Sequence, residues 1–154
     1  MGCYRKILVA LDGSSDARAG LQHAATLAGD QHARLVVLTV VPAPKPVTSV
    51  GGPTLVTDHE SASMQELNEA VGALPANIGV ESRLTTGRPA RRILEVAEQS
   101  GCDLIVMGCH GHGRLHQALI GSVSDTVLRE SRLPVLLVRA CQPAADEAVP
   151  SPVG

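Results

Sequence analysis

The sequence predicts an α/β protein with a single doubly wound sheet of five parallel strands and helices on both faces. Apolar runs typical of strands that are covered on both sides alternate with segments of helical periodicity along the 154 residues. The connections are short, and a helical crossover between successive strands makes those strands parallel. Neither an internal repeat nor a second domain is indicated.

The first predicted strand covers residues 4–11 and ends at an Asp-Gly turn, after which two serines can cap a helix. Residues 17–29 carry apolar side chains at helical spacing. Residues 34–41 (RLVVLTVV) form a continuous apolar run that a proline ends, as expected of a buried strand. The prolines and glycines that follow predict a flexible loop at residues 43–59.

The second half continues the alternation of helix and strand. Its predicted segments are a helix at 60–74, a strand at 79–85, a helix that begins near Pro89 and stops at Gly101, a strand at 102–107, a helix at 115–131 and a strand at 133–139. We therefore expect one domain over residues 1–141 and a disordered tail over residues 142–154.

Composition excludes several classes of function. The formal net charge is -2 and no basic block stands out, so a nucleic-acid partner is not expected. Tyr4 is the one aromatic residue, which argues against a site that stacks bases on aromatic rings. The apolar runs are too short to span a membrane, and the first six residues do not resemble a secretory signal, so a cytoplasmic protein is expected.

Residues 108–122 (GCHGHGRLHQALIGS) are rich in glycine and lie between a predicted strand and a helix. Glycine lets backbone N–H groups approach an anion closely, and a helix N-terminus adds partial positive charge. Gly121 offers a further close approach, and Ser122 and Ser124 each offer a hydroxyl. These features predict a phosphate site, but the P-loop and dinucleotide fingerprints are both absent. A plain connection without a ligand fits the composition equally well.

A metal site and a catalytic site are less well supported. Cys109, His110, His112 and His116 lie within eight residues, yet no second cluster of ligands exists elsewhere, so solvated histidines are the favoured interpretation. No catalytic motif is visible. Of the nearest acids, Asp12 can instead shape the Asp-Gly turn and Asp125 can lie on a solvated helix face, so no base for hydrolysis is identified.

The spacing in this segment resembles the signature of the universal stress protein family, specifically of its ATP-binding subset. That signature is Gly, two residues, Gly, nine residues, Gly and then Ser or Thr, and residues 108–122 match it at each position. Residues 6–14 (KILVALDGS) are similar to the opening strand and turn of the family, and residues 87–108 and 122–139 are similar to its later helices and strands. The resemblance covers roughly residues 3–140.

The resemblance implies a Rossmann-like fold of the adenine nucleotide alpha hydrolase type that binds an adenine nucleotide. It places Asp12 and the backbone of Val40 at the adenine, with Ala10 and Met107 lining the base and ribose. An ionised carboxylate suits that place because it accepts from the adenine amino group. The full set implied is Ala10, Leu11, Asp12, Val40, Met107, Gly108, Gly111, His112, Gly121, Ser122, Val123 and Ser124, with the residues from Gly108 onward around the ribose and phosphates.

Two positions depart from the family pattern. The family often has Arg at the position of His112 and Gly at that of Arg114. Because Arg is always charged and His is not, it stays open whether ATP or AMP is preferred and whether Arg114 substitutes for the missing Arg. The resemblance also leaves a role for Mg²⁺ open.

The expected function is that of an adenine-nucleotide-binding stress regulator. We expect a binding module rather than an enzyme, with at most slow ATP hydrolysis or autophosphorylation at Ser122 or Ser124. The alternatives are a dimeric interaction scaffold whose nucleotide site is vestigial and, ranked last, a metal-binding redox protein. A homodimer is expected through the last strand, residues 134–139, because an outer apolar strand invites pairing with its copy. A further protein partner is expected but not identified.

Overall fold

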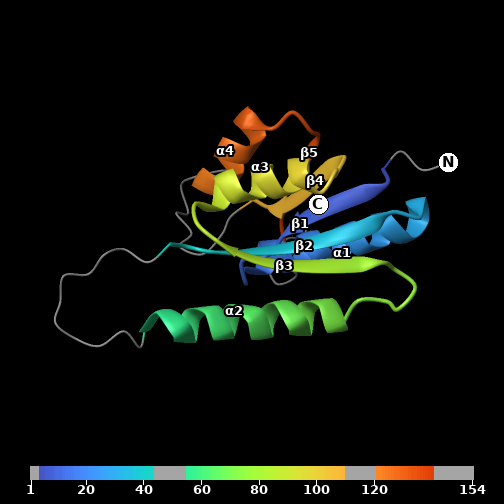
Figure 1. Cartoon of the computed structure of the whole chain (residues 1–154). Helices are drawn as coiled ribbons and strands as arrows, with labels where there is room; N and C mark the ends of the chain where they lie inside the picture. Colours follow the sequence, from blue (N-terminus) through green and yellow to red (C-terminus); the bar gives the residue numbers. More distant parts are fainter. Residues whose placement is uncertain (1–3, 44–54, 110–120, 141–154) are drawn as a thin grey trace, which may run out of the picture.

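A computed structural model describes residues 4–43, 55–109 and 121–140, with the backbone alone at residues 55–59. Figure 1 shows the strands in the middle of the molecule with helices above and below them. The strands are β1 (Lys6–Ala10), β2 (Arg34–Val41), β3 (Val80–Thr86), β4 (Leu104–Gly108) and β5 (Val135–Val138). The helices are α1 (Ser15–Gln31), α2 (Leu55–Gly72), α3 (Pro89–Gln99) and α4 (Ser122–Glu130).

The sheet is parallel throughout and has the order β3-β2-β1-β4-β5. The predicted doubly wound fold is therefore confirmed. The winding direction reverses between β1 and β4, which are hydrogen-bonded neighbours in the middle of the sheet. In sheets of this kind the crevice outside the carboxyl ends of the two central strands is the usual place for a ligand.

Two apolar cores cover the two faces of the sheet. The core under α1 and α2 contains Ile7, Leu35 and Leu67, and the core under α3 and α4 contains Leu8, Ile93 and Val127. No Phe or Trp is available in the sequence, so both cores are built mainly from Leu, Ile, Val and Ala, with Met107 and Cys102 in the core under α3 and α4. Among the described helices, none combines the length and the apolar character that crossing a bilayer requires.

The observed starts of two helices can be compared with the predicted ones. Helix α2 begins at Leu55 rather than at residue 60, because the residues that break helices end at Pro53 and none occurs in residues 55–59. Helix α4 begins at Ser122, because Gly121 has extended dihedral angles (φ -69°, ψ 161°) and cannot continue a helix that starts earlier; residues 115–120 of the predicted helix lie outside the described residues. The rest of the predicted loop, residues 44–54, and the tail lie outside the described residues.

Candidate functional site

The carboxyl ends of β1, β2 and β4 and the first turn of α4 bring several of the predicted site residues together. Ala10, Val40 and Val123 are partly buried, and Met107 is buried. All four pack in the core under α3 and α4, so the three strands present these side chains to one face of the sheet. The apolar lining that the resemblance implies for a base and ribose is thus assembled beside α4.

Leu11 lies on the other side of the sheet. Its side chain is buried in the core under α1 and α2. Its amide donates to the carbonyl oxygen of Leu38 at 2.8 Å. Of the predicted site residues at the end of β1, Leu11 can therefore contribute its backbone but not its side chain to a site on the face of α3 and α4.

Asp12 is exposed and shapes the turn that leads into α1. Its Oδ1 accepts hydrogen bonds from the amide of Ser14 at 2.9 Å and from the hydroxyl of Ser14 at 2.5 Å. Ser14 in turn caps α1, because its Oγ accepts from the amide of Ala17 at 3.1 Å. The turn thus fixes the carboxylate, and no described residue donates to the second oxygen, Oδ2. That oxygen remains an acceptor at the rim of the crevice.

Gly108 is required for packing as well as for any ligand. A Cβ at this position would lie 2.7 Å from the amide nitrogen of Ala17 and 2.8 Å from two atoms of Asp16, so β4 approaches the first turn of α1 more closely than any side chain allows. The carbonyl of Gly108 accepts from the buried hydroxyl of Ser124 at 2.7 Å. Gly108 and Ser124 therefore hold β4, α1 and α4 together at the crevice.

The backbone amides near the crevice divide into those already bonded and those at the start of α4. The amide of Cys109 donates to Val138 at 3.0 Å, and the amide of Gly121 donates to the carbonyl oxygen of Cys109 at 2.7 Å. Gly121 is the N-cap of α4 and has no side chain to cap it. The first amides of a helix have no partner within the helix. Among the described residues, the amides that could form the expected anion site are therefore those of the first turn of α4, at residues 122–124.

Part of the predicted site cannot be placed. Gly111 and His112 lie outside the described residues, as do the histidines of the metal alternative, His110 and His116. Cys109, the remaining member of that alternative, is buried. Within the described part of the chain, no group of three or more His, Cys, Asp or Glu residues could hold a metal ion.

Asp16 is a residue at this edge that the sequence reasoning missed. It is 3% exposed, and its Oδ1 accepts from the amide of Ala140 at 2.9 Å. The carboxylate joins the start of α1 to the chain just after β5. An acid in the first turn of a helix is a recognisable signal because it complements the helix dipole. Its burial follows only from the sheet order, which places β4 and β5 beside α1.

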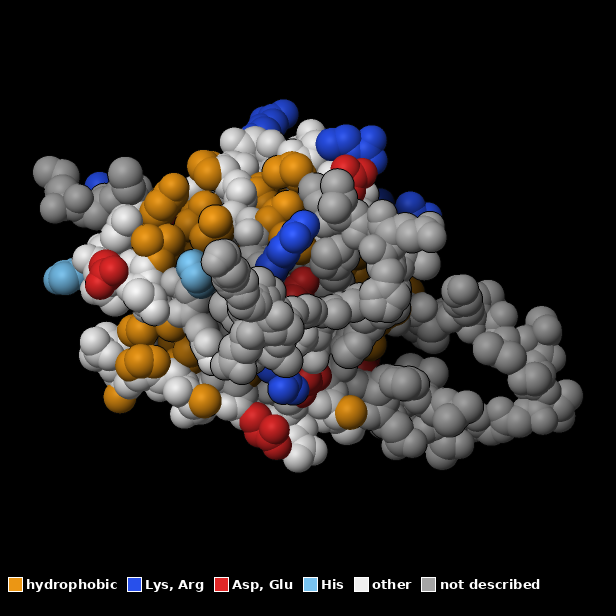
Figure 2. All heavy atoms as spheres, turned by 180° about the vertical axis from the view of Figure 1, so that it is seen from behind, with side chains coloured by type: hydrophobic (Ala, Val, Ile, Leu, Met, Phe, Trp, Pro, Cys, Tyr) orange, Lys and Arg blue, Asp and Glu red, His pale blue; other side chains and the backbone are white. Residues whose placement is uncertain are grey.

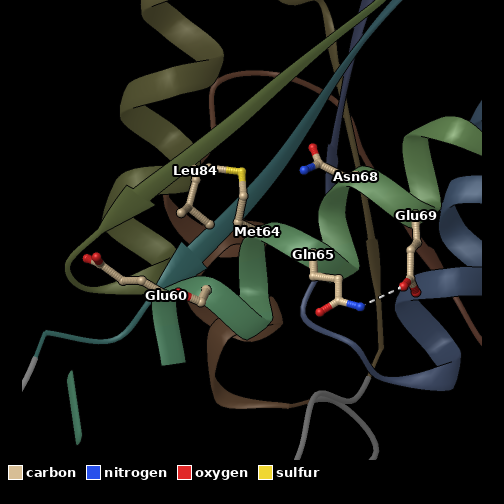
Figure 3. Close-up of a pocket in the computed structure, with 7 residues that line it drawn as sticks. Glu60, Met64, Gln65, Asn68, Glu69 and Leu84 are labelled. Carbon is tan, nitrogen blue, oxygen red and sulfur yellow. Dashed lines mark hydrogen bonds between the residues drawn. The ribbon is translucent and has the colours of Figure 1, made fainter. Parts of the chain in front are cut away.

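Two of the grooves that described residues line can be compared with the candidate site. One lies between α3 and α4, is about 680 Å³ in volume and adjoins the crevice through Ser122 and Val123. The other lies on α2 beside β3 (Figure 3), with the side chains of Met64 and Leu84 close together and Glu60 and Glu69 at its ends. Because the second groove lies on the face of the sheet that α2 covers, opposite to α3 and α4, it takes no part in the candidate site.

Comparisons with known proteins agree with this geometry. Residues 3–139 match the model of the family described as the Universal stress protein family. The chain is 34% identical to the universal stress protein YxiE of Bacillus subtilis over 148 residues, which covers 88% of this chain and 99% of that protein.

Two solved structures are similar over nearly the whole chain. A universal stress protein family member from Burkholderia pseudomallei is 33% identical, with a TM-score of 0.71 over 88% of this chain and 96% of that one. A universal stress protein solved in complex with cAMP is 26% identical, with a TM-score of 0.68 over 91% of this chain and 100% of that one.

Proposed function

The chain belongs to the universal stress protein family, and from this premise we propose that it binds adenine nucleotides as a member of the ATP-binding subset. The observation that carries the proposal is the first turn of α4, whose N-cap Gly121 has no side chain to cap it and which begins directly at the end of the glycine signature, at the crevice of a doubly wound sheet. A relative with this fold holds cAMP, which is an adenine nucleotide with one phosphate.

In the proposed complex the base lies at the ends of β1 and β2 and the phosphates lie at α4. Oδ2 of Asp12 accepts from the adenine amino group, and the backbone of Val40 pairs with the edge of the base. Ala10 and Met107 supply the apolar contacts. The first-turn amides of α4 bind a phosphate, with the exposed Ser122 as a further donor. Gly111 and His112 complete the proposed set. Where Mg²⁺ is bound with ATP, it would neutralise phosphate charge.

We propose a binding module rather than a hydrolase. Of the acids considered as a base, Asp125 is paired with Arg129 at 2.9 Å on an exposed helix face, and the Oδ1 of Asp12 serves the turn. Slow autophosphorylation, if it occurs, would modify Ser122 rather than Ser124, because the hydroxyl of Ser124 is buried and donates to Gly108.

The direct test is to identify the nucleotide that the protein carries or binds. With one Tyr and no Trp the protein absorbs little at 280 nm, so a peak near 260 nm in purified protein would reveal a bound nucleotide. Acid release and chromatography beside AMP, ADP and ATP standards would identify it. Calorimetric titration of nucleotide-free protein with each standard measures the affinities. Protein that carries no nucleotide and binds none would contradict the proposal.

A dimeric scaffold with a vestigial site is the second candidate. One observation favours it: the amides of Cys109 and Gly121 are already bonded to carbonyls of the protein itself. In this case the glycines would serve packing alone, as Gly108 does against α1. The same titration distinguishes the two, because a vestigial site binds no adenine nucleotide.

We also propose a homodimer through β5. This strand pairs with β4 on one side and ends the sheet on the other. Leu136 on β5 and Leu128 on α4 are 36% and 44% exposed. Figure 2 shows groups of apolar side chains on the face of the molecule opposite to that of Figure 1. An outer strand with exposed apolar residues pairs readily with a second copy.

A further inference from the structure

We propose that Arg88 binds the phosphates beyond the first, so that the site prefers ADP and ATP to AMP. The proposal rests on the nucleotide site proposed above and adds a residue to it that the glycine signature does not contain. The evidence for this proposal is the groove between α3 and α4 and the charged residues that line the groove.

Arg88 and Ser122 lie at the same end of this groove. Arg88 is the N-cap residue of α3, and Ser122 is the first residue of α4. Both residues line the groove. The two helices follow parallel strands and run back against them, so both begin at the carboxyl edge of the sheet (Figure 1). A phosphate chain that continues past Ser122 into the groove therefore meets Arg88 on the opposite wall.

Arg88 is the groove arginine without an acidic partner among the described residues. Nε of Arg91, which also lines the groove, lies 3.1 Å from Oε1 of Glu95. The same carboxylate accepts from Nη1 of Arg92 at 2.8 Å. No carboxylate in the described part of the chain lies within ion-pair distance of the exposed Arg88. Its guanidinium is therefore free to form paired hydrogen bonds with an anion, as guanidinium groups do with phosphate.

The opposite end of the groove is acidic. Glu98 and Glu130 also line it. Glu98 lies further along α3 and Glu130 lies further along α4. At a rise of 1.5 Å per residue, Glu98 is about 15 Å from Arg88 and Glu130 is about 12 Å from Ser122. The negative charge of a phosphate chain is thus favoured at the end that holds Arg88 and two helix N-termini, and disfavoured at the other. The charges along the groove therefore favour added phosphates at the end that holds Arg88.

The test compares affinities for ATP and AMP in matched variants by calorimetric titration. Arg88→Ala should lower ATP affinity by roughly ten- to a hundred-fold, the usual effect of losing a charged hydrogen-bond donor. AMP affinity should change less than about two-fold, because its one phosphate ends at α4. Arg88→Lys should restore part of the ATP affinity, since it keeps the charge but not the fork. Arg91→Ala, in the same groove, should leave both affinities unchanged.

Each outcome separates this inference from the function on which it rests. Equal losses of ATP and AMP affinity in Arg88→Ala, or no loss of either, would overturn the role of Arg88 and leave the nucleotide site intact. If Arg91→Ala lowered ATP affinity as much as Arg88→Ala does, the specific role of Arg88 would also be overturned, because any positive charge in the groove would then support ATP binding. If the unaltered protein binds neither nucleotide, both proposals fall. Circular dichroism of each variant checks that α3 still forms.

Discussion

Gly108 illustrates at the residue scale how one position can serve both packing and binding. The family signature assigns it to a nucleotide, whereas the structure gives it a contact that is independent of any ligand. The atoms that a Cβ would meet there belong mainly to the backbone of α1, and backbone cannot move aside as a flexible side chain can. Loss of binding in a Gly108 variant would therefore not by itself identify a ligand contact.

We expect Gly108→Ala to destabilise the fold by about 1–3 kcal/mol, the usual cost of overpacking. Gly29→Ala is the matched control, because nothing lies within 4 Å of a Cβ there and the residue is inside α1. That change should stabilise the protein by about 0.5–1 kcal/mol. Urea unfolding followed by circular dichroism measures both, and a neutral Gly108→Ala variant would show that β4 and α1 can separate without cost.

Cys102 gives the fold a pH dependence in the alkaline range. Burial raises the pKa of this thiol from 9.0 to about 11. In the unfolded chain the thiol ionises above about pH 9, whereas in the folded protein it stays protonated up to about pH 11. Ionisation therefore favours the unfolded chain in this window, and stability should fall as the pH rises from 9 to 11.

Comparison with Cys102→Ser measures this effect, because serine does not titrate in that range. The unaltered protein should lose more unfolding free energy between pH 9 and pH 11 than the variant does. Native Cys102 should also react slowly with iodoacetamide at pH 8, and quickly in urea. Labelling of the Cys102 peptide at equal rates in both conditions would contradict the burial of the thiol.

Several residues of the candidate site could be predicted from the sequence because their signals are local. Glycine spacing and the Asp-Gly turn identify Gly108, Gly121 and Asp12 without knowledge of the fold. Asp16 and Arg88 could not be found in this way. The role of Asp16 depends on the neighbouring strands that bury it. That of Arg88 depends on a groove between two helices that are distant in sequence.

The start of α4 is the feature that matters most at the scale of elements. The apolar pattern predicts a helix from residue 115, and among the described residues α4 begins at Ser122. The periodicity of side chains indicates which face of a helix is apolar, but it does not indicate the backbone dihedral angles. The extended backbone of Gly121 determines where α4 begins. Because α4 begins at Ser122, its first turn lies at the end of the glycine signature, where the first-turn amides can bind an anion.

We expect Gly121→Val to abolish nucleotide binding while the protein stays folded. The φ of -69° at Gly121 is accessible to any L residue, so the backbone is not strained and the branched side chain tests only the space beside the first turn. Gly72→Val at the end of α2, where a Cβ meets nothing within 4 Å, is the control. Unchanged affinity in a folded Gly121→Val variant would show that phosphate does not lie there.

At the scale of the whole molecule, the fold is the best predicted feature. Five alternations of strand and helix with short connections leave few topologies other than a doubly wound parallel sheet, and the observed order has that winding. Association is harder to predict. A half-exposed Leu136 on β5 is compatible with a free surface and with an interface, since single exposed apolar residues are common.

We expect Leu136→Lys to convert the proposed dimer into a monomer, because a charged side chain opposes edge-to-edge pairing of strands. Sedimentation velocity of the two proteins over a range of concentrations measures this. Met64→Lys, another exposed apolar residue but on α2 at the far edge of the sheet, is the control and should remain dimeric. A monomer in the unaltered protein, or a dimer that survives Leu136→Lys, would contradict the proposed interface.

The bond between Asp16 and Ala140 also bears on how the protein can be handled. It fastens the backbone just after β5 to the start of α1, beside the same glycine that ends β4. The backbone at Ala140, the last described residue, is therefore held at a point next to the crevice. A label attached just after β5 therefore shares the neighbourhood of the proposed ligand, whereas one attached just before β1 lies at the opposite edge of the sheet.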